Sequence, residues 1–131
     1  MKSYLQKHDK IKYSNHWSTP DDIYDKYVIK EKYYDPCPLY SDDFDFSIVY
    51  DKVFLNPPYS EITKWIEWAL YSHRNSKQHM VILIPSRTDT KYFHKLLNYG
   101  CELEFMRGRL KFGGLNTPAP FPSVLVHLCK N

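Results

Sequence analysis

The chain has 131 residues, enough for one hydrophobic core and too few for two domains of ordinary size. Hydrophobic residues make up 43% and charged residues 25% of the sequence, which is the balance of an ordinary soluble globular protein. The formal net charge is only +3, so a polyanionic partner is permitted, but the dense basic clusters of a nucleic-acid-coating protein are missing.

The first elements in chain order are a polar arm, a helix and a short strand. Residues 1–14 are predicted to form the flexible arm. Thr19 is a good N-cap, Pro20 suits the first helical position, and two aspartates then favour the positive end of the helix dipole. These signals predict a helix over Pro20–Ile29. Lys32–Asp35 is a strand candidate, which the following prolines stop.

The middle of the chain alternates between strand and helix patterns. A short strand is expected at Lys52–Leu55, and apolar residues at helical spacing predict an amphipathic helix over Glu61–His73. The continuous apolar run Met80–Ile84 is typical of a strand that is buried on both faces. Asp89–Tyr99 is predicted to be a second amphipathic helix, which Gly100 ends.

Three more strands are predicted near the C-terminus, at Glu102–Met106, Arg109–Phe112 and Ser123–Cys129. The loop Gly113–Pro122 is long enough either to reach a groove or to be only a connection. Strands and helices that alternate in this way predict one α/β domain over residues 1–131. We expect a mainly parallel sheet with helices on both faces and an antiparallel C-terminal edge.

Cysteines and apolar runs narrow the class of protein. The three cysteines are far apart and outside any CxxC or Cys/His pattern, so we expect neither a disulfide framework nor a metal site. No apolar run approaches the roughly 20 residues that cross a bilayer, and the polar start does not resemble a signal peptide. We therefore expect a soluble protein of a reducing cytoplasm, with no membrane association.

Three predicted strands end in distinctive residues, where α/β sheets bind ligands. The first ends at Asp35, the second at the stretch Asn56-Pro57-Pro58-Tyr59, and the third at Ser86 and Arg87. Carboxyl ends of parallel strands share one edge of the sheet, so these residues are expected to line one crevice.

The stretch Asn56-Pro57-Pro58-Tyr59 has residue types that suit the binding of a planar amine. The Asn56 amide oxygen accepts hydrogen bonds, and the two prolines force an extended backbone whose carbonyls have no strand partner. Two such acceptors would hold an exocyclic amine and draw its lone pair out of conjugation, while Tyr59 offers a face for stacking. The alternative is an ordinary turn. The position of this stretch between a strand and an amphipathic helix favours the functional interpretation.

This stretch resembles the catalytic motif of S-adenosylmethionine-dependent amino methyltransferases. With its surroundings, the chain resembles the phage-type DNA N6-adenine methyltransferases from Trp17 to Leu128. The matching stretches are Trp17–Pro20, Asp35–Pro38, Asn56–Ser60 followed by Trp65, Leu83–Thr90, and Gly108–Phe112 followed by a Pro-Ala-Pro loop.

The resemblance implies roles for individual residues. It implies that Asn56, Pro57, Pro58 and Tyr59 hold a flipped adenine. An enzyme that acts on a base in duplex DNA must take that base out of the stack. Contacts with S-adenosylmethionine are implied for Trp17, Thr19, Pro20, Asp35 and Pro36, and Asp43 or Asp45 is left for the ribose hydroxyls. For Asp35 a turn carboxylate is the alternative, and for Trp17 a core anchor. Trp65 is expected in the core.

The sequence departs from most methyltransferases after Asp35, where the usual Gly-rich loop is missing. Only 20 residues, Pro36 to Leu55, separate Asp35 from Asn56, too few for two strand–helix units. We therefore expect a reduced Rossmann-like methyltransferase fold.

Contacts with DNA are expected from residues that follow the later strands. The candidates are Ser60, Arg87, Lys91, Arg107, Arg109 and Lys111. Their cations suit phosphate contacts, which position a duplex without reading its sequence. A solvated charged face is the alternative.

The leading hypothesis is therefore a DNA adenine-N6 methyltransferase, phage or prophage encoded, which acts as a monomer or homodimer in a bacterial cytoplasm. One alternative is the same chemistry on RNA adenine or a protein glutamine. The other is a non-catalytic nucleic-acid-binding module that has lost cofactor binding.

Overall fold

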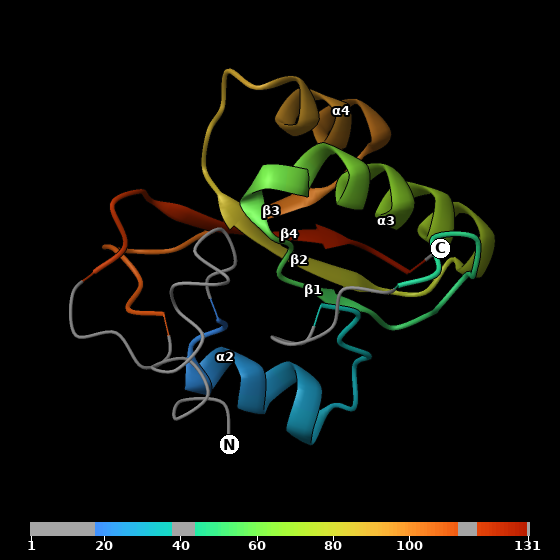
Figure 1. Cartoon of the computed structure of the whole chain (residues 1–131), viewed down its shortest axis with the longest axis horizontal. Coiled ribbons are helices and arrows are strands. Elements are labelled where there is room, and N and C mark those ends of the chain that lie inside the picture. The colour runs from blue at the N-terminus through green and yellow to red at the C-terminus, as the bar shows by residue number, and fades with distance from the viewer. Residues whose placement is uncertain (1–17, 38–43, 113–117, 131) are drawn as a thin grey trace.

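The computed structural model describes residues 18–37, 44–112 and 118–130. A four-stranded sheet lies between helices, with α2 below it and α3 and α4 above it in Figure 1. The elements in chain order are α2 (Asp21–Tyr24), the π-helical η1 (Asp25–Lys30), β1 (Phe54–Leu55), the 3₁₀-helical η2 (Tyr59–Glu61), α3 (Ile62–Ser76), β2 (Met80–Pro85), α4 (Lys91–Tyr99), β3 (Glu102–Phe105) and β4 (Ser123–Leu128). Within the described ranges no helix is long and apolar enough to cross a membrane.

The sheet is mixed, so the expectation of a mainly parallel sheet is not confirmed. Its order is β1-β2-β4-β3, in which β1 and β2 are parallel and β4 is antiparallel to both of its neighbours. Consequently β1, β2 and β3 run in one direction and β4 runs against them. The strand β4 is inside the sheet because its apolar residues require burial, whereas β3 exposes two glutamates and suits an edge.

Two predicted strands do not form. Lys32–Asp35 contributes only an isolated parallel bridge between Tyr34 and Val53. Arg109–Phe112 has no strand structure, because β2 and β3 already occupy both sides of β4 and no edge of that strand is left for it. The chain also bends before this segment, at Gly108, whose φ of 72° is readily adopted only by glycine.

The predicted helices are present, with shifted starts. The first runs through α2 and η1 from Asp21 to Lys30. Its N-cap is Pro20, which has no side-chain cap, so the prediction that Thr19 caps this helix is wrong. By contrast, Thr90 caps α4 and accepts from the Phe93 amide.

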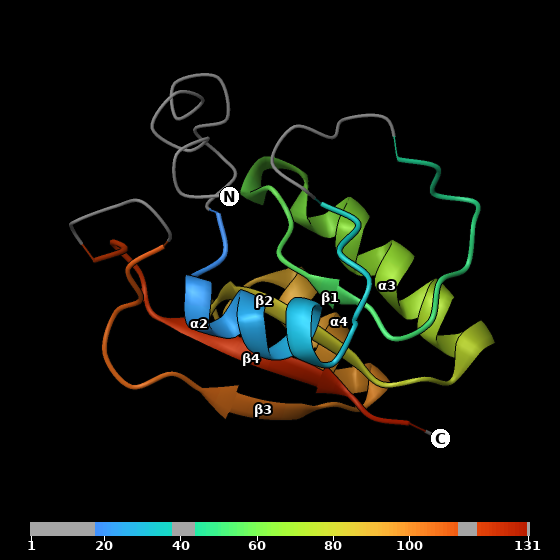
Figure 2. The same cartoon turned by 90° about the horizontal axis from the view of Figure 1, so that it is seen from below.

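Helices cover both faces of the sheet with separate apolar clusters. On the upper face, α3 and α4 bury Ile66, Leu96 and Trp65 against β1, β2 and β4; Trp65 is 5% exposed, which confirms its expected core position. On the lower face, Ile23 and Tyr27 pack against β2 and β4, and Figure 2 shows this helix crossing these strands. The two layers hold the strand ends in place.

A chain of hydrogen bonds ties the lower face together near the amino end of β2. The Tyr33 hydroxyl bonds His79 Nδ1 at 2.6 Å, and His79 Nε2 bonds His127 Nδ1 at 3.0 Å. His127 Nε2 then bonds a Glu104 carboxylate oxygen at 3.0 Å. Burial, and then the neighbouring His127, lower the pKa of His79 from its ordinary value of 6.5.

This lowered pKa predicts a loss of stability in acid. As the pH falls below about 6.5, the unfolded chain takes up a proton at His79 before the folded protein does, so the unfolded state gains. Stability continues to fall until the pH reaches the pKa of His79 in the folded protein. Thermal unfolding at pH 7 and pH 5 should show a smaller acid shift for His79→Gln than for wild type. The exposed control His94→Gln should keep the wild-type shift, and an equal shift in all three proteins would contradict the prediction.

Candidate functional site

The candidate site lies at the sheet edge where β1, β2 and β3 end and β4 begins, at the left in Figure 1. Backbone hydrogen bonds join the loops at this edge. The Ser86 amide donates to the Pro122 carbonyl at 2.9 Å, and the Met106 amide donates to the Ser123 carbonyl at 3.2 Å. The residues after β1, after β2 and before β4 therefore share one edge, as expected for a ligand crevice.

Asn56 is held rigidly at this edge. It follows β1 directly and is 2% exposed, and its Nδ2 donates to Thr19 Oγ1 at 3.0 Å. Pro57 and Pro58 then lead the chain out of the sheet, because proline cannot continue its hydrogen-bonding pattern. The bond to Thr19 fixes the amide so that its oxygen is directed away from Thr19. The residue predicted to cap a helix therefore orients Asn56 instead.

Tyr59 lies at the start of η2 with its ring half-buried and its hydroxyl fully buried. Among the described residues this hydroxyl has no hydrogen-bond partner. Burial, and then Tyr92, raise the pKa of Tyr59 far above its ordinary value of 10, while Arg87 opposes the shift. The phenol therefore stays neutral, and its ring rather than its charge is available for recognition.

Phe121 completes an aromatic corner with Tyr59. The two rings meet edge to face, with centroids 5.3 Å apart and an interplanar angle of 77°. The Arg87 guanidinium lies 5.9 Å from the centre of the Phe121 ring, within cation–π range. Phe121 was not among the residues predicted for the site. Its only signal was an aromatic residue among the prolines that precede the last strand.

Two serine hydroxyls are also buried at this edge; Ser86 was expected to line the crevice, whereas Ser123 was missed. Ser86 follows β2 and Ser123 begins β4, and in the part of the chain that the structure describes neither hydroxyl has a hydrogen-bond partner. A single serine beside a strand carries no sequence signal for such a position. Both hydroxyls add polar groups to the edge that holds Asn56.

The cofactor candidates differ in how deeply they are buried. Asp35 is half-buried, and its Oδ1 accepts from the Cys37 amide at 3.1 Å, the turn that was the alternative interpretation. Tyr24 lies close enough for Asp35 to raise its pKa, after the larger effect of burial. Thr19, Pro20 and Pro36 are all buried. Trp17 and Asp43 lie outside the described residues.

Asp45 is exposed and engaged within its own loop. Its carboxylate accepts from the Ser47 hydroxyl at 2.6 Å and from the Ser47 amide at 2.9 Å, and these bonds lower its pKa. The structure thus shows a local turn at Asp45, whose role toward a ribose stays a prediction.

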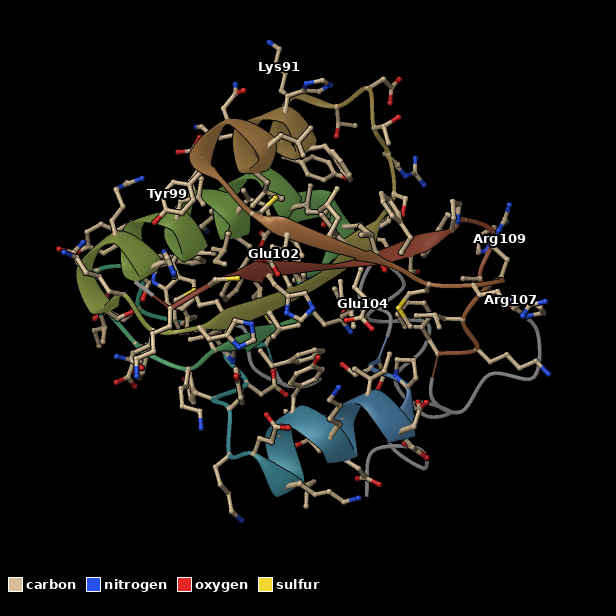
Figure 3. The ribbon with its side chains drawn as sticks, turned by 180° about the vertical axis from the view of Figure 1, so that it is seen from behind. Lys91, Tyr99, Glu102, Glu104, Arg107 and Arg109 are labelled. Atoms are coloured by element: carbon tan, nitrogen blue, oxygen red, sulfur yellow. The ribbon has the colours of Figure 1, made fainter. Side chains whose placement is uncertain are left out.

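The predicted DNA-contact residues are all exposed, but they do not form one patch. Arg87 lies beside Phe121. Figure 3 shows Arg107 and Arg109 together beyond the end of β3. Lys91 lies apart from them and points away from α4. Ser60 lines an open groove of ≈ 650 Å³ that extends from Tyr59 along α3 to Glu67. Within the described ranges, no group of three or more acidic, histidine or cysteine side chains is placed to hold a metal ion.

The family model described as DNA N-6-adenine-methyltransferase (Dam) matches residues 39–120, which include Asn56, Tyr59 and Arg87. No curated protein and no solved structure matches the chain.

Proposed function

Since the chain belongs to the DNA N-6-adenine-methyltransferase (Dam) family, we propose that it transfers a methyl group from S-adenosylmethionine to N6 of adenine in DNA. One observation carries the proposal. The matched region contains the Asn-Pro-Pro-Tyr stretch, and this stretch begins at the carboxyl end of β1 with Asn56 buried and oriented by Thr19.

The residues at this edge suit an amine nucleophile. The Asn56 amide oxygen and the Pro57 carbonyl would accept the two hydrogens of the adenine amino group, which localises the nitrogen lone pair for attack. Tyr59 would stack on the base, a contact that is worth roughly 1–3 kcal/mol. The proton leaves after attack, so the residues need not include a base that removes it first.

The residues present also fit the cofactor at its methionine end. S-adenosylmethionine would supply the electrophilic methyl group. The half-buried Asp35 carboxylate offers a charged acceptor for an ammonium group, Tyr24 lies on the helix α2 beside it, and the Thr19 hydroxyl lies just before that helix. Asp43 or Asp45 is proposed for the ribose hydroxyls.

The proposal is tested by incubating the purified full chain with labelled S-adenosylmethionine and duplex DNA. Digestion of the DNA to nucleosides and mass spectrometry should reveal N6-methyladenine. Short RNA and a glutamine-containing peptide serve as competing acceptors, and label found only in either of these would overturn the DNA assignment. DNA binding without any binding of S-adenosylmethionine would instead favour a non-catalytic module.

Replacing Asp35 by asparagine should weaken the binding of S-adenosylmethionine. The change removes the charge and keeps the shape, and hydrogen bonds to charged groups contribute about 1.5–3 kcal/mol, or roughly 10- to 150-fold in Kd. Isothermal titration measures the change directly. Asp51→Asn, at an exposed acid that precedes β1 on the opposite edge, is the matched control. Equal affinities of both variants and wild type would exclude Asp35 from the cofactor site.

A further inference from the structure

A row of exposed cations follows the carboxyl end of β3. We call residues 106–112 the basic strip. Its exposed cations are Arg107, Arg109 and Lys111. Its remaining large residues are apolar and pack into the cluster on the lower face; they are Met106, Leu110 and Phe112. Apolar side chains therefore anchor the strip while its cations face solvent.

The cations of the strip share one side of the chain. From Arg109 to Phe112 the residues are exposed, half-buried, exposed and buried, the period of two of an extended backbone. Figure 3 shows Arg107 and Arg109 projecting from the same side of the loop. As alternate residues of this extended stretch, Arg109 and Lys111 are about 6.7 Å apart along the backbone, close to the separation of neighbouring phosphates along one DNA strand.

These cations are also available for a partner. In the described part of the chain, the ion pairs are Lys95 with Glu67 and His127 with Glu104, so no carboxylate neutralises the strip. Three cations without a described ion pair, close together on one anchored segment, form an array that matches a polyanion.

The strip adjoins the position proposed for the target base. The Ala119 amide donates to the Leu110 carbonyl at 2.8 Å, which ties the strip to the segment that carries Phe121. Phe121 in turn contacts the Tyr59 ring. The phosphates nearest to a base in this corner belong to its own strand.

Acidic residues limit the path of that strand. Glu102 and Glu104 are exposed on the edge strand β3, and Figure 3 shows them apart from Arg107 and Arg109. Phosphates are repelled there, so a DNA strand that reaches the strip is expected to pass the carboxyl ends of the β-strands rather than to run along β3.

We propose that the basic strip tracks the backbone of the DNA strand that carries the target adenine, through about three consecutive phosphates. The inference rests on the proposed function for the identity of the base, and it adds the strand and the residues that hold it. The contacts carry no sequence information, because they go to phosphates.

The first test is the salt dependence of binding to a fluorescent duplex, measured by anisotropy with the full chain and no cofactor. Each phosphate contact contributes about 0.9 to the slope of log K against log salt for B-DNA. We expect Arg107→Gln, Arg109→Gln and Lys111→Gln each to reduce the slope by about this amount. The Arg74→Gln control, in the last turn of α3 at the opposite edge, should keep the wild-type slope. Circular dichroism confirms that each variant folds. Arg109→Lys keeps the positive charge, so it should keep the wild-type slope.

The second test identifies the strand. Neutral methylphosphonates replace three phosphates beside the target adenine, either on its own strand or on the complement. Wild type should lose slope only with the first duplex, and the triple glutamine variant should not distinguish the two. Equal losses on both strands, or unchanged slopes in the variants, would overturn the strip. Slopes as expected without any methyl transfer would leave the strip standing and reject the proposed activity alone.

Discussion

Replacing Asn56 by alanine should lower kcat for DNA methylation by roughly 10²–10³-fold, the usual loss when one positioned polar group is removed from a reacting centre. Asn56 is 2% exposed, and its amide is oriented by Thr19. No other described side chain is placed after β1 to take over its role. Initial rates with saturating S-adenosylmethionine and DNA measure the effect.

Two controls make this result interpretable. Asn75→Ala removes an exposed amide that only donates to the Tyr71 carbonyl within α3, and it should leave kcat unchanged. Binding of S-adenosylmethionine by Asn56→Ala shows that the edge is still folded. Full activity of a folded Asn56→Ala protein would show that the Asn-Pro-Pro-Tyr stretch is only a turn.

Replacing Tyr59 by alanine should weaken the productive binding of DNA by about 1–3 kcal/mol, which is roughly 5- to 150-fold in kcat/KM. The substitution removes the face proposed to stack on adenine, together with the contact to Phe121 at 5.3 Å. The loss should appear in kcat/KM for DNA, while the Kd for S-adenosylmethionine stays close to that of wild type.

Tyr59→Phe separates the ring from the hydroxyl. In the described structure this hydroxyl is buried without a hydrogen-bond partner, and its raised pKa keeps it neutral. Removing it should therefore leave the free energy of unfolding unchanged or slightly raised. Its kcat/KM should remain near wild type if stacking is the role of Tyr59. Equal losses in both variants would instead assign the role to the hydroxyl.

Local sequence patterns determined most of the helices and the end of β1. Apolar spacing predicted α3 and α4, and Gly100 predicted the end of α4, because a helix depends on neighbours within one or two turns. Proline has the same local effect in any fold, so Pro57 and Pro58 alone required β1 to stop at the site. The family resemblance seen in the sequence is confirmed by the match over residues 39–120.

Only the tertiary structure decided how distant parts meet. A strand pattern does not specify its neighbour, so the sequence did not reveal that β4 inserts between β2 and β3 and leaves 109–112 without a pairing edge. Thr19 was expected to cap a helix, yet it orients Asn56, which is 37 residues away. Phe121 gains its place at the site through tertiary contacts, among them those with Tyr59 and Arg87. These contacts depend on the packing of the whole chain, whereas local patterns reach only a few residues.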